Sequence, residues 1–348
     1  MKLLVTGGAG YIGSVVAAQL LASGHEVVIL DDFSRGHREA VPAGARLVEV
    51  DLVDREGVVG ALGEGFDAAL HFAALALVGE SVEHPERYWR NNVVGTANLL
   101  EGLREAQVKR LVFSSTCATY GEPEEVPIRE DFPTRPTNPY GASKLAVDWM
   151  IGSECRAHGL SAISLRYFNV AGASGNLGED HYPETHIIPN VLRAALGILP
   201  AVELYGTDYP TPDGTAIRDY IHIEDLAEAH TLAVDGLREE EHVVYNLGNG
   251  NGFSVREVIE RGREVTGRDI EVVERPRRPG DPPALVAASE RIKEELGWAP
   301  HKPELATMIA DAWTWLQAHP DGYGEGPPAE PAGEGATAAV PPPDVGEG

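Results

Sequence analysis

A tyrosine and a lysine four residues apart carry the clearest chemical signal in the sequence. Tyr140 and Lys144 stand in the run YGASK, and on a helix this spacing puts both side chains on one face, one turn apart. A free tyrosine titrates near pH ~10, too high for an efficient base at neutral pH, but an adjacent cation lowers that pKa. We therefore predict that Tyr140 is a catalytic base supported by Lys144. A solvated pair on an exposed helix is the alternative interpretation.

A run of hydroxyl residues precedes this pair. Ser114 ends an apolar stretch, and Thr116 lies in the turn STCATYG that follows. If the stretch is a parallel strand, its carboxyl end faces the crevice in which doubly wound sheets bind cofactors. We predict that the hydroxyl of Thr116 is the partner of Tyr140.

A glycine-rich loop near the start of the chain predicts a dinucleotide site. Gly7, Gly10 and Gly13 permit a tight turn and close approach of the backbone to a pyrophosphate at a helix N-terminus. Asp31 ends the next apolar run, where an acid can bond a ribose 2′-hydroxyl. Asp31 and Asp32 together should repel a 2′-phosphate, so we predict NAD rather than NADP as the cofactor.

Alternating apolar and amphipathic stretches supply the framework for these residues. Near-continuous apolar runs separated by helical patterns predict an α/β fold, a Rossmann-type doubly wound parallel sheet, over residues 1–170. Shorter elements after residue 170 predict a smaller α+β substrate domain over residues 171–320, with some chain crossing back. Gly, Pro and acidic residues dominate 321–348, which predicts a disordered tail. The expected strands are Leu3–Val5, Glu26–Leu30, Leu47–Val50, Ala68–Phe72, Arg110–Ser114 and Ala162–Arg166, and the expected helices include 12–22, 85–106, 224–234, 254–266 and 304–318.

Charge and composition exclude several partners. The 54 acidic and 28 basic residues give a net charge of −26, which repels nucleic acid and anionic membranes. Apolar runs are shorter than a membrane span requires. Two cysteines, Cys117 and Cys155, are too few for a disulfide framework, so we expect a cytoplasmic protein. We assign no residues to a metal ion.

Taken together, these motifs resemble the extended short-chain dehydrogenase/reductase superfamily and, within it, the UDP-glucose 4-epimerase family. The resemblance extends from residue 1 to about residue 323. It implies NAD as the cofactor, a UDP-sugar as the substrate, and a homodimer formed through the helices around 85–106 and 138–157. The stretches that carry it are VTGGAGYIGS, HFAALALVGES, NNVVGTANLL, FSSTCATYGEP, NPYGASK, LRYFNVAGA, GTAIRDYIHIEDLA, YNLGNG and RRPGDPPALVAAS.

The resemblance also implies the ligand contacts. The NAD contacts, with Gly13 added from the glycine loop, are Gly7, Gly10, Tyr11, Ile12, Asp31, Asp51, Leu52, Phe72, Ala73, Asn91, Ser114, Tyr140, Lys144 and Tyr167. The UDP-sugar contacts are Thr116, Asn169, His186, Arg218, Arg278, Asp281 and Leu285. Arg218 and Arg278 also suit a diphosphate as forked donors, although Arg278 could belong to a solvated charge run. Ala76 stands where some members carry a lysine near the cofactor phosphates, and Thr116 where some carry a serine.

The residues after Thr116 narrow the reaction. Related dehydratases place an acid pair there, but this chain has Cys117 and Ala118, and the glutamate of related decarboxylases is also missing. We therefore predict epimerisation at C4 of a UDP-hexose, UDP-galactose or UDP-glucose, through a 4-keto sugar. The alternatives are a UDP-N-acetylglucosamine or UDP-pentose 4-epimerase, a net NAD-dependent dehydrogenase, and a cofactor-sensing regulator. Leu285 occupies a position where family members vary between tyrosine and smaller residues; it widens the sugar pocket or packs in the core.

Overall fold

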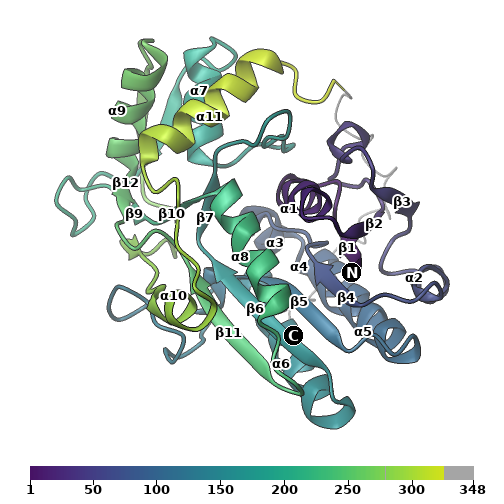
Figure 1. The fold of residues 1–348 in the computed structure, drawn as a ribbon. Coiled ribbons are helices and arrows are strands. Elements are labelled where there is room, and N and C mark those ends of the chain that lie inside the picture. The colour runs from purple at the N-terminus through teal and green to yellow at the C-terminus, as the bar shows by residue number, and fades with distance from the viewer. Residues whose placement is uncertain (279, 325–348) are drawn as a thin grey trace, which may run out of the picture.

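A seven-stranded parallel sheet forms the centre of the molecule (Figure 1). The computed structural model describes residues 1–278 and 280–324. Every neighbouring pair of strands in this sheet is parallel, which confirms the predicted doubly wound α/β fold. In spatial order the strands are β11 (His242–Leu247), β6 (Ser161–Tyr167), β5 (Arg110–Thr116), β4 (Ala68–His71), β1 (Lys2–Thr6), β2 (Glu26–Asp31) and β3 (Arg46–Glu49).

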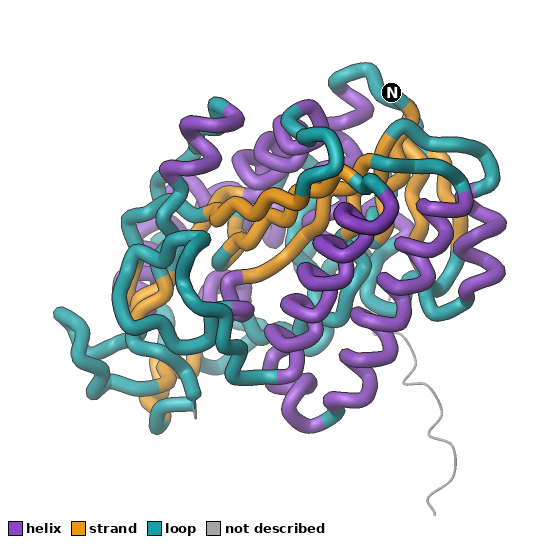
Figure 2. The backbone as a smooth tube through the Cα atoms, turned by 90° about the horizontal axis from the view of Figure 1, so that it is seen from below, coloured by secondary structure: helices purple, strands orange, loops and turns teal. Residues whose placement is uncertain are grey.

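Helices cover both faces of the sheet (Figure 2). On one face, α1 (Tyr11–Ala22), α8 (Ile223–Asp235) and α10 (Glu290–Leu296) contribute to one apolar core. On the other, α2 (Arg55–Leu62), α5 (Gly95–Glu105) and α6 (Pro139–His158) contribute to a second. Because both faces are buried, the central strands are apolar at nearly every position rather than at alternate ones.

The sheet takes its last strand from a distant part of the sequence. The six expected strands correspond to β1–β6, but β11 pairs with β6 and comes from beyond residue 170. Its Val243, Tyr245 and Leu247 are buried in the same core as α8. The chain therefore returns to the first layer after residue 170, while the exact division into two domains stays a prediction.

The second lobe is built on three helices that share one core. These are α7 (Ile187–Ala195), α9 (Val255–Thr266) and α11 (Leu305–Ala318), which group together at the top left of Figure 1. The helix α9 begins with a capping box between Ser254 and Glu257. Three small sheets complete the lobe: β7 (Asn169–Ala171) with β10 (Tyr220–His222); β12 (Phe253–Ser254), β9 (Ile217–Arg218) and β14 (Ala284–Leu285); and β8 (Val202–Tyr205) with β13 (Val272–Arg275).

The expected helix over 85–106 contains an irregular turn. Between α4 (Pro85–Tyr88) and α5, residues Trp89–Val94 form a π-helical turn, labelled η2. This turn buries Asn92, whose amide contacts both the backbone of Leu75 and the hydroxyl of Ser143 on α6. The irregular turn thus fixes the loop after β4 against the start of α6.

The remaining elements are short. They are α3 (Val78–Glu83) and two 3₁₀ turns, η1 (Arg38–Ala40) and η3 (Cys117–Thr119). The predicted disordered tail lies almost wholly outside the described residues, of which only 321–324 belong to it. Within the described ranges, every helix is too short or too polar to span a bilayer.

Candidate active site

The glycine loop joins β1 to α1 and leaves no room for side chains. Gly7 has a φ of +71°, and a Cβ added there would lie 2.5 Å from the backbone nitrogen of Ala73. A Cβ at Gly13 would lie 2.2 Å from the carbonyl oxygen of Gly7. The helix α1 begins at Tyr11, and its N-cap Gly10 provides no side-chain cap, so backbone N–H groups of its first turn are available to a ligand. This is the geometry of a phosphate cradle.

Asp31 braces the same loop from the end of β2. Its side chain accepts hydrogen bonds from the backbone nitrogens of Ala9 and Phe33, both at 2.9 Å, and the residue is 7% exposed. Burial raises the pKa of this carboxyl, although the two backbone bonds act in the opposite direction. Asp31 thus lies at the mouth of the glycine loop, where its predicted ribose contact requires it.

The other residues expected to contact NAD surround the ends of neighbouring strands. Phe72 and Ala73 follow β4 and donate their backbone N–H groups to the carbonyl of Thr6, at 3.0 and 3.2 Å. Leu52 is buried against Gly95, and its carbonyl accepts from Asn98. Tyr11 and Ile12 open α1, Asp51 accepts from the backbone of Val53, and Asn91 lies in the π turn beside Asn92.

Close contact between α6 and the hydroxyl turn places Tyr140 beside Thr116. Asn138 caps α6, Pro139 occupies its first turn, and a Cβ at Gly141 would lie 2.4 Å from the carbonyl oxygen of Ala118. The glycine therefore lets the helix approach η3. The Thr116 side chain lies close enough to the Tyr140 phenol to lower its pKa, while the Thr116 hydroxyl oxygen accepts a hydrogen bond from the backbone nitrogen of Ala118 at 3.2 Å.

Lys144 lies beneath these hydroxyls, 4% exposed. Its Nζ donates to the carbonyl oxygen of Ser114 at 2.8 Å and lies 4.8 Å from the centre of the Phe113 ring. Burial lowers the pKa of Lys144 to about 7. Burial also raises the pKa of Tyr140, and the nearby Thr116 side chain offsets only part of this rise. The predicted support of the Tyr140 phenolate by Lys144 stays a prediction; here desolvation dominates the pKa of Tyr140, and the Lys144 ammonium bonds a backbone carbonyl.

Two more hydroxyls complete this edge of the sheet. Ser114 lies in β5 two residues before its last residue, Thr116, which pairs with Tyr167 at the end of β6, and the hydroxyls of Ser114 and Tyr167 form a hydrogen bond. Burial raises the pKa of Tyr167 to about 12. Ser114, Thr116, Tyr140 and Tyr167 thus gather around Lys144 at the carboxyl ends of two parallel strands.

The expected diphosphate residues lie on β9 and on the turn before β14. Arg218 forms an ion pair with Asp281 and donates to the carbonyl of Ile217 at 2.7 Å. Arg278 and Asp281 share a turn, closed by a 3.2 Å bond from the Asp281 nitrogen to the Arg278 carbonyl. The Arg278 guanidinium is exposed and lies 4.0 Å from the centre of the Tyr205 ring. Leu285 pairs in register with Arg218 and packs, partly buried, on the core around Tyr120 and Phe168.

Asn169 is held by the backbone of Asp219, a buried residue that the sequence did not single out. Its amide donates to the carbonyl of Asp219 at 2.9 Å. The Asp219 side chain is fully buried and accepts from the backbone nitrogens of Asn249, Gly250 and Ala287. Asp219 thus ties β9 to the YNLGNG turn and to β14, and its place directly after Arg218 was the only sequence signal.

His71 is a second buried polar residue that the sequence analysis missed. Its ring nitrogens contact the hydroxyls of Thr6 and Thr96 at 2.7 and 2.8 Å. Burial lowers its pKa to about 3, so the ring is neutral. It joins β1, β4 and α5 behind the glycine loop.

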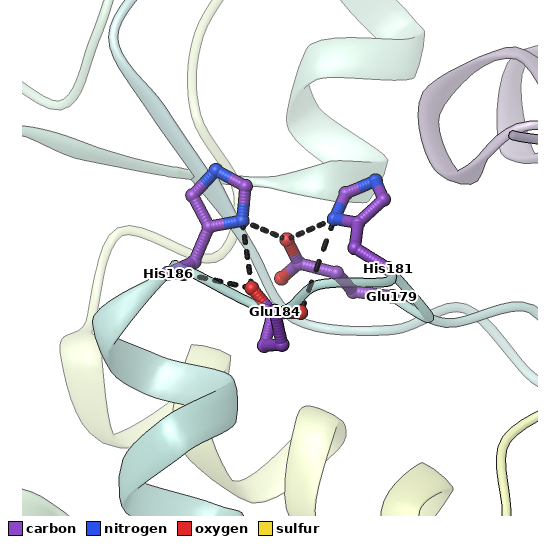
Figure 3. Close-up of side chains that lie close together, drawn as sticks. All are labelled: Glu179, His181, Glu184 and His186. Carbon is purple, nitrogen blue, oxygen red and sulfur yellow. Dashed lines mark hydrogen bonds and ion pairs between the residues drawn. The ribbon is translucent and has the colours of Figure 1, made fainter. Parts of the chain in front are cut away.

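His186 lies in the loop before α7. Its Nδ1 contacts carboxylate oxygens of Glu179 at 2.8 Å and Glu184 at 3.1 Å, and His181 lies beside them (Figure 3). Burial alone would lower the pKa of His186, but the two carboxylates outweigh it and raise that pKa. Its predicted contact with the UDP-sugar stays a prediction.

Comparison with known proteins gives consistent matches. The profile of the NAD dependent epimerase/dehydratase family matches residues 3–248. A UDP-glucose 4-epimerase of Corynebacterium glutamicum is 57% identical over 318 residues, covering 91% of this chain and 96% of the relative. A UDP-glucose 4-epimerase of Streptomyces lividans is 58% identical over 326 residues, covering 92% and 98%. The crystal structure of UDP-glucose 4-epimerase from Brucella ovis in complex with NAD superimposes with a TM-score of 0.86 at 45% identity, covering 90% of this chain and 97% of that one.

Proposed function

The chain belongs to the NAD dependent epimerase/dehydratase family and within it to the UDP-glucose 4-epimerases, and from this premise we infer that it interconverts UDP-galactose and UDP-glucose. The main structural support for this function is the group of hydroxyls around Lys144. It lies at the carboxyl edge of the sheet that holds the glycine loop, where such folds bind their ligands.

The glycine loop fits NAD. Gly7 and Gly13 keep the turn free of side chains, and the start of α1 offers backbone donors for a pyrophosphate. Asp31 lies within hydrogen-bond distance of the loop backbone, where it would accept from a ribose hydroxyl and repel a 2′-phosphate. Bound NAD would supply reversible hydride acceptance at C4 of the sugar, and Gly7, Gly13 and Asp31 would hold it.

Tyr140 is proposed to move the proton of the sugar's O4. As phenolate it accepts the O4 proton while C4 is oxidised, and it returns that proton when the 4-keto sugar is reduced on its other face. Over one full cycle Tyr140 takes up one proton and releases one, so no net proton is gained or lost. Thr116 lies near the phenol and lowers its pKa, which supports a role for its hydroxyl in relaying or orienting the same proton. Lys144, fixed by the Ser114 carbonyl, supplies the nearby cation when protonated.

The residues after Thr116 explain why the cycle stops at epimerisation. Burial raises the pKa of the Cys117 thiol to about 12, and Ala118 carries no titratable group. Neither can donate or accept a proton at neutral pH, so elimination of water has no catalyst there.

Arg218 and Arg278 are proposed to hold the diphosphate. Arg278 lies in the same turn as Asp281, and Arg218 already binds the carboxylate of Asp281. Binding of the nucleotide would replace that carboxylate at the guanidinium and free Asp281 for a ribose or sugar hydroxyl.

We propose a homodimer formed through the helices around 85–106 and 138–157. Large apolar side chains are exposed there, Trp89, Val94 and, at 65% exposure, Trp149. A second copy of the chain would cover them. We also propose a cytoplasmic location, since Cys117 and Cys155 are both unpaired, as suits a reducing compartment.

One experiment tests the proposed function directly. The purified protein, without added NAD, is incubated with UDP-galactose, UDP-glucose, UDP-N-acetylglucosamine and a UDP-pentose, and the products are resolved. We expect UDP-galactose and UDP-glucose to interconvert, with no NADH accumulating and with near-stoichiometric NAD released on denaturation. NADH formed in proportion to substrate would identify a net dehydrogenase, and no conversion of any sugar would refute the proposal.

A further inference from the structure

Four side chains in the loop before α7 point toward one another (Figure 3). They are Glu179, His181, Glu184 and His186, spaced as Glu-x-His-x-x-Glu-x-His. The side chains of Glu179 and Glu184 are only 9% and 3% exposed. The chemistry proposed above uses none of these side chains, and only His186 was expected from the sequence to contact the UDP-sugar.

The donor atoms are spaced for one metal ion. One atom from each residue lies within 4.8 Å of all the others. The distances from the Nδ1 atoms to the carboxylate oxygens are 2.8 and 3.1 Å for His186, and 3.1 and 3.9 Å for His181. A tetrahedral zinc ion with bonds of about 2.0–2.1 Å needs its ligands about 3.3 Å apart. The observed distances fall on both sides of that value.

One nitrogen atom of this cluster lacks a hydrogen-bond partner. The Nδ1 of His181 is buried and has no hydrogen-bond partner, although it faces the Glu179 carboxylate at 3.1 Å. Buried polar atoms without a partner are rare in folded proteins. A metal ion would take the lone pair of this nitrogen and that of His186 at the same time.

The negative charge of the two carboxylates favours binding of a divalent cation in this cluster. Two nearly buried carboxylates carry a charge of −2, which is costly to bury without compensation. A divalent ion with two neutral imidazoles makes the site neutral overall. Two nitrogens and two oxygens with no cysteine are a donor set that zinc accepts, and four protein ligands are typical of a structural rather than a catalytic site.

Hydrogen bonds and a ring contact join the loop that contains the cluster to neighbouring parts of the molecule. The Tyr11 hydroxyl donates to the carbonyl of Gly172 at 2.7 Å, and the ring of Tyr11 packs edge-on against that of His181. Arg35 donates to the carbonyl of Tyr182, and the backbone nitrogen of Tyr323 donates to Asp180. A metal here would fix the loop between the glycine loop and the start of α7.

We propose that Glu179, His181, Glu184 and His186 form a structural site for a divalent transition metal, with zinc as the fitting ion. This differs from the expectation from sequence, which assigned no residue to a metal. The spacing of the four residues was a signal in the sequence, but it matches none of the common zinc motifs.

Zinc binding to the full-length protein tests the site. The protein is treated with a chelator, given Zn²⁺ and separated from free metal, and its metal content and Tm are measured. We expect about one zinc per chain, and a Tm about 3–6 °C higher at a zinc concentration 100 times the Kd. Glu179→Gln and His181→Ala should each weaken zinc binding by about tenfold or more. The matched control is His84→Ala, which removes an exposed histidine paired with Glu86 and should bind zinc like the wild type.

The wild-type protein alone can overturn the proposal. If it retains no zinc and its Tm does not change with zinc, the cluster is a network of histidine–carboxylate pairs. Equal zinc binding by the wild type and a folded Glu179→Gln variant would place the metal elsewhere and refute the site.

Discussion

Replacing Lys144 with Met should stabilise the folded protein while removing most activity. Lys144 is almost fully buried, and its ammonium donates a hydrogen bond to the Ser114 carbonyl. Methionine has a similar length but no charge to desolvate. We infer that the protein keeps this buried ammonium, although it destabilises the fold, because the site needs a cation beside Tyr140.

The structure sets the size and the sign of this effect. The pKa of Lys144 falls from the 10.5 of a free lysine to about 7, and each pKa unit corresponds to about 1.36 kcal/mol. Because the folded pKa is the lower one, the folded state binds fewer protons than the unfolded state between these values, and stability rises with pH there. Burial of the Lys144 ammonium therefore lowers the free energy of unfolding by about 5 kcal/mol at pH 6 and by about 2 kcal/mol at pH 9. Loss of the bond to Ser114 subtracts about 1–3 kcal/mol at every pH.

Thermal unfolding between pH 6 and pH 9 measures the difference. After removal of bound nucleotide, the Tm of Lys144→Met relative to wild type should fall by about 5 °C from pH 6 to pH 9. Lys109→Met, at an exposed lysine, should show no such trend. Turnover of Lys144→Met should fall by about 10²-fold or more. A Tm difference that does not change with pH would show that the pKa of Lys144 is not lowered in the folded protein, and the reasoning would be refuted.

Three further substitutions examine the proposed roles. Tyr140→Phe removes the proton acceptor but keeps the ring, so turnover should fall about 10²–10⁴-fold while UDP-sugar binding by calorimetry stays nearly unchanged; turnover within threefold of wild type would exclude Tyr140 as the base. Thr116→Val should lower turnover and Thr116→Ser should keep most of it, and equal activity of the two variants would make the hydroxyl structural. Leu285→Tyr should suppress epimerisation of UDP-N-acetylglucosamine, by about 1–3 kcal/mol of discrimination, while sparing UDP-galactose. Equal loss on both sugars, or a wild type inactive on the N-acetyl sugar, would mean that Leu285 packs in the core and does not select the substrate.

Much of the sheet could be predicted because its strands are buried on both faces. Apolar runs such as those of β1 and β2, separated by helical patterns, leave few alternatives to a parallel sheet. The strand β11 was missed because its register with β6 depends on pairing between residues about 80 positions apart. Sequence patterns report local structure, and they do not show which distant strand will complete an edge.

The candidate site shows the same limit. The spacing of Tyr140 and Lys144 correctly places them one helical turn apart, but it does not show that the ammonium turns to the Ser114 carbonyl. His71 was missed because a single polar residue in an apolar stretch gives no sign of its burial, and Asp219 because its place beside Arg218 gives no sign of its partners. Tertiary packing decides both, and for these residues it also decides the pKa.

The position of β11 affects how the chain folds during its synthesis. The strands β1 to β6 leave the ribosome before α8 and β11, so β6 presents an unpaired edge and α1 an uncovered apolar face until residue 247 has emerged. A nascent chain of about 170 residues is thus open to edge-to-edge aggregation, and a fragment of that length should not fold alone. Closure of the sheet joins the two halves of the chain into one cooperative unit, so partial products of synthesis or proteolysis should be degraded rather than accumulate as active halves.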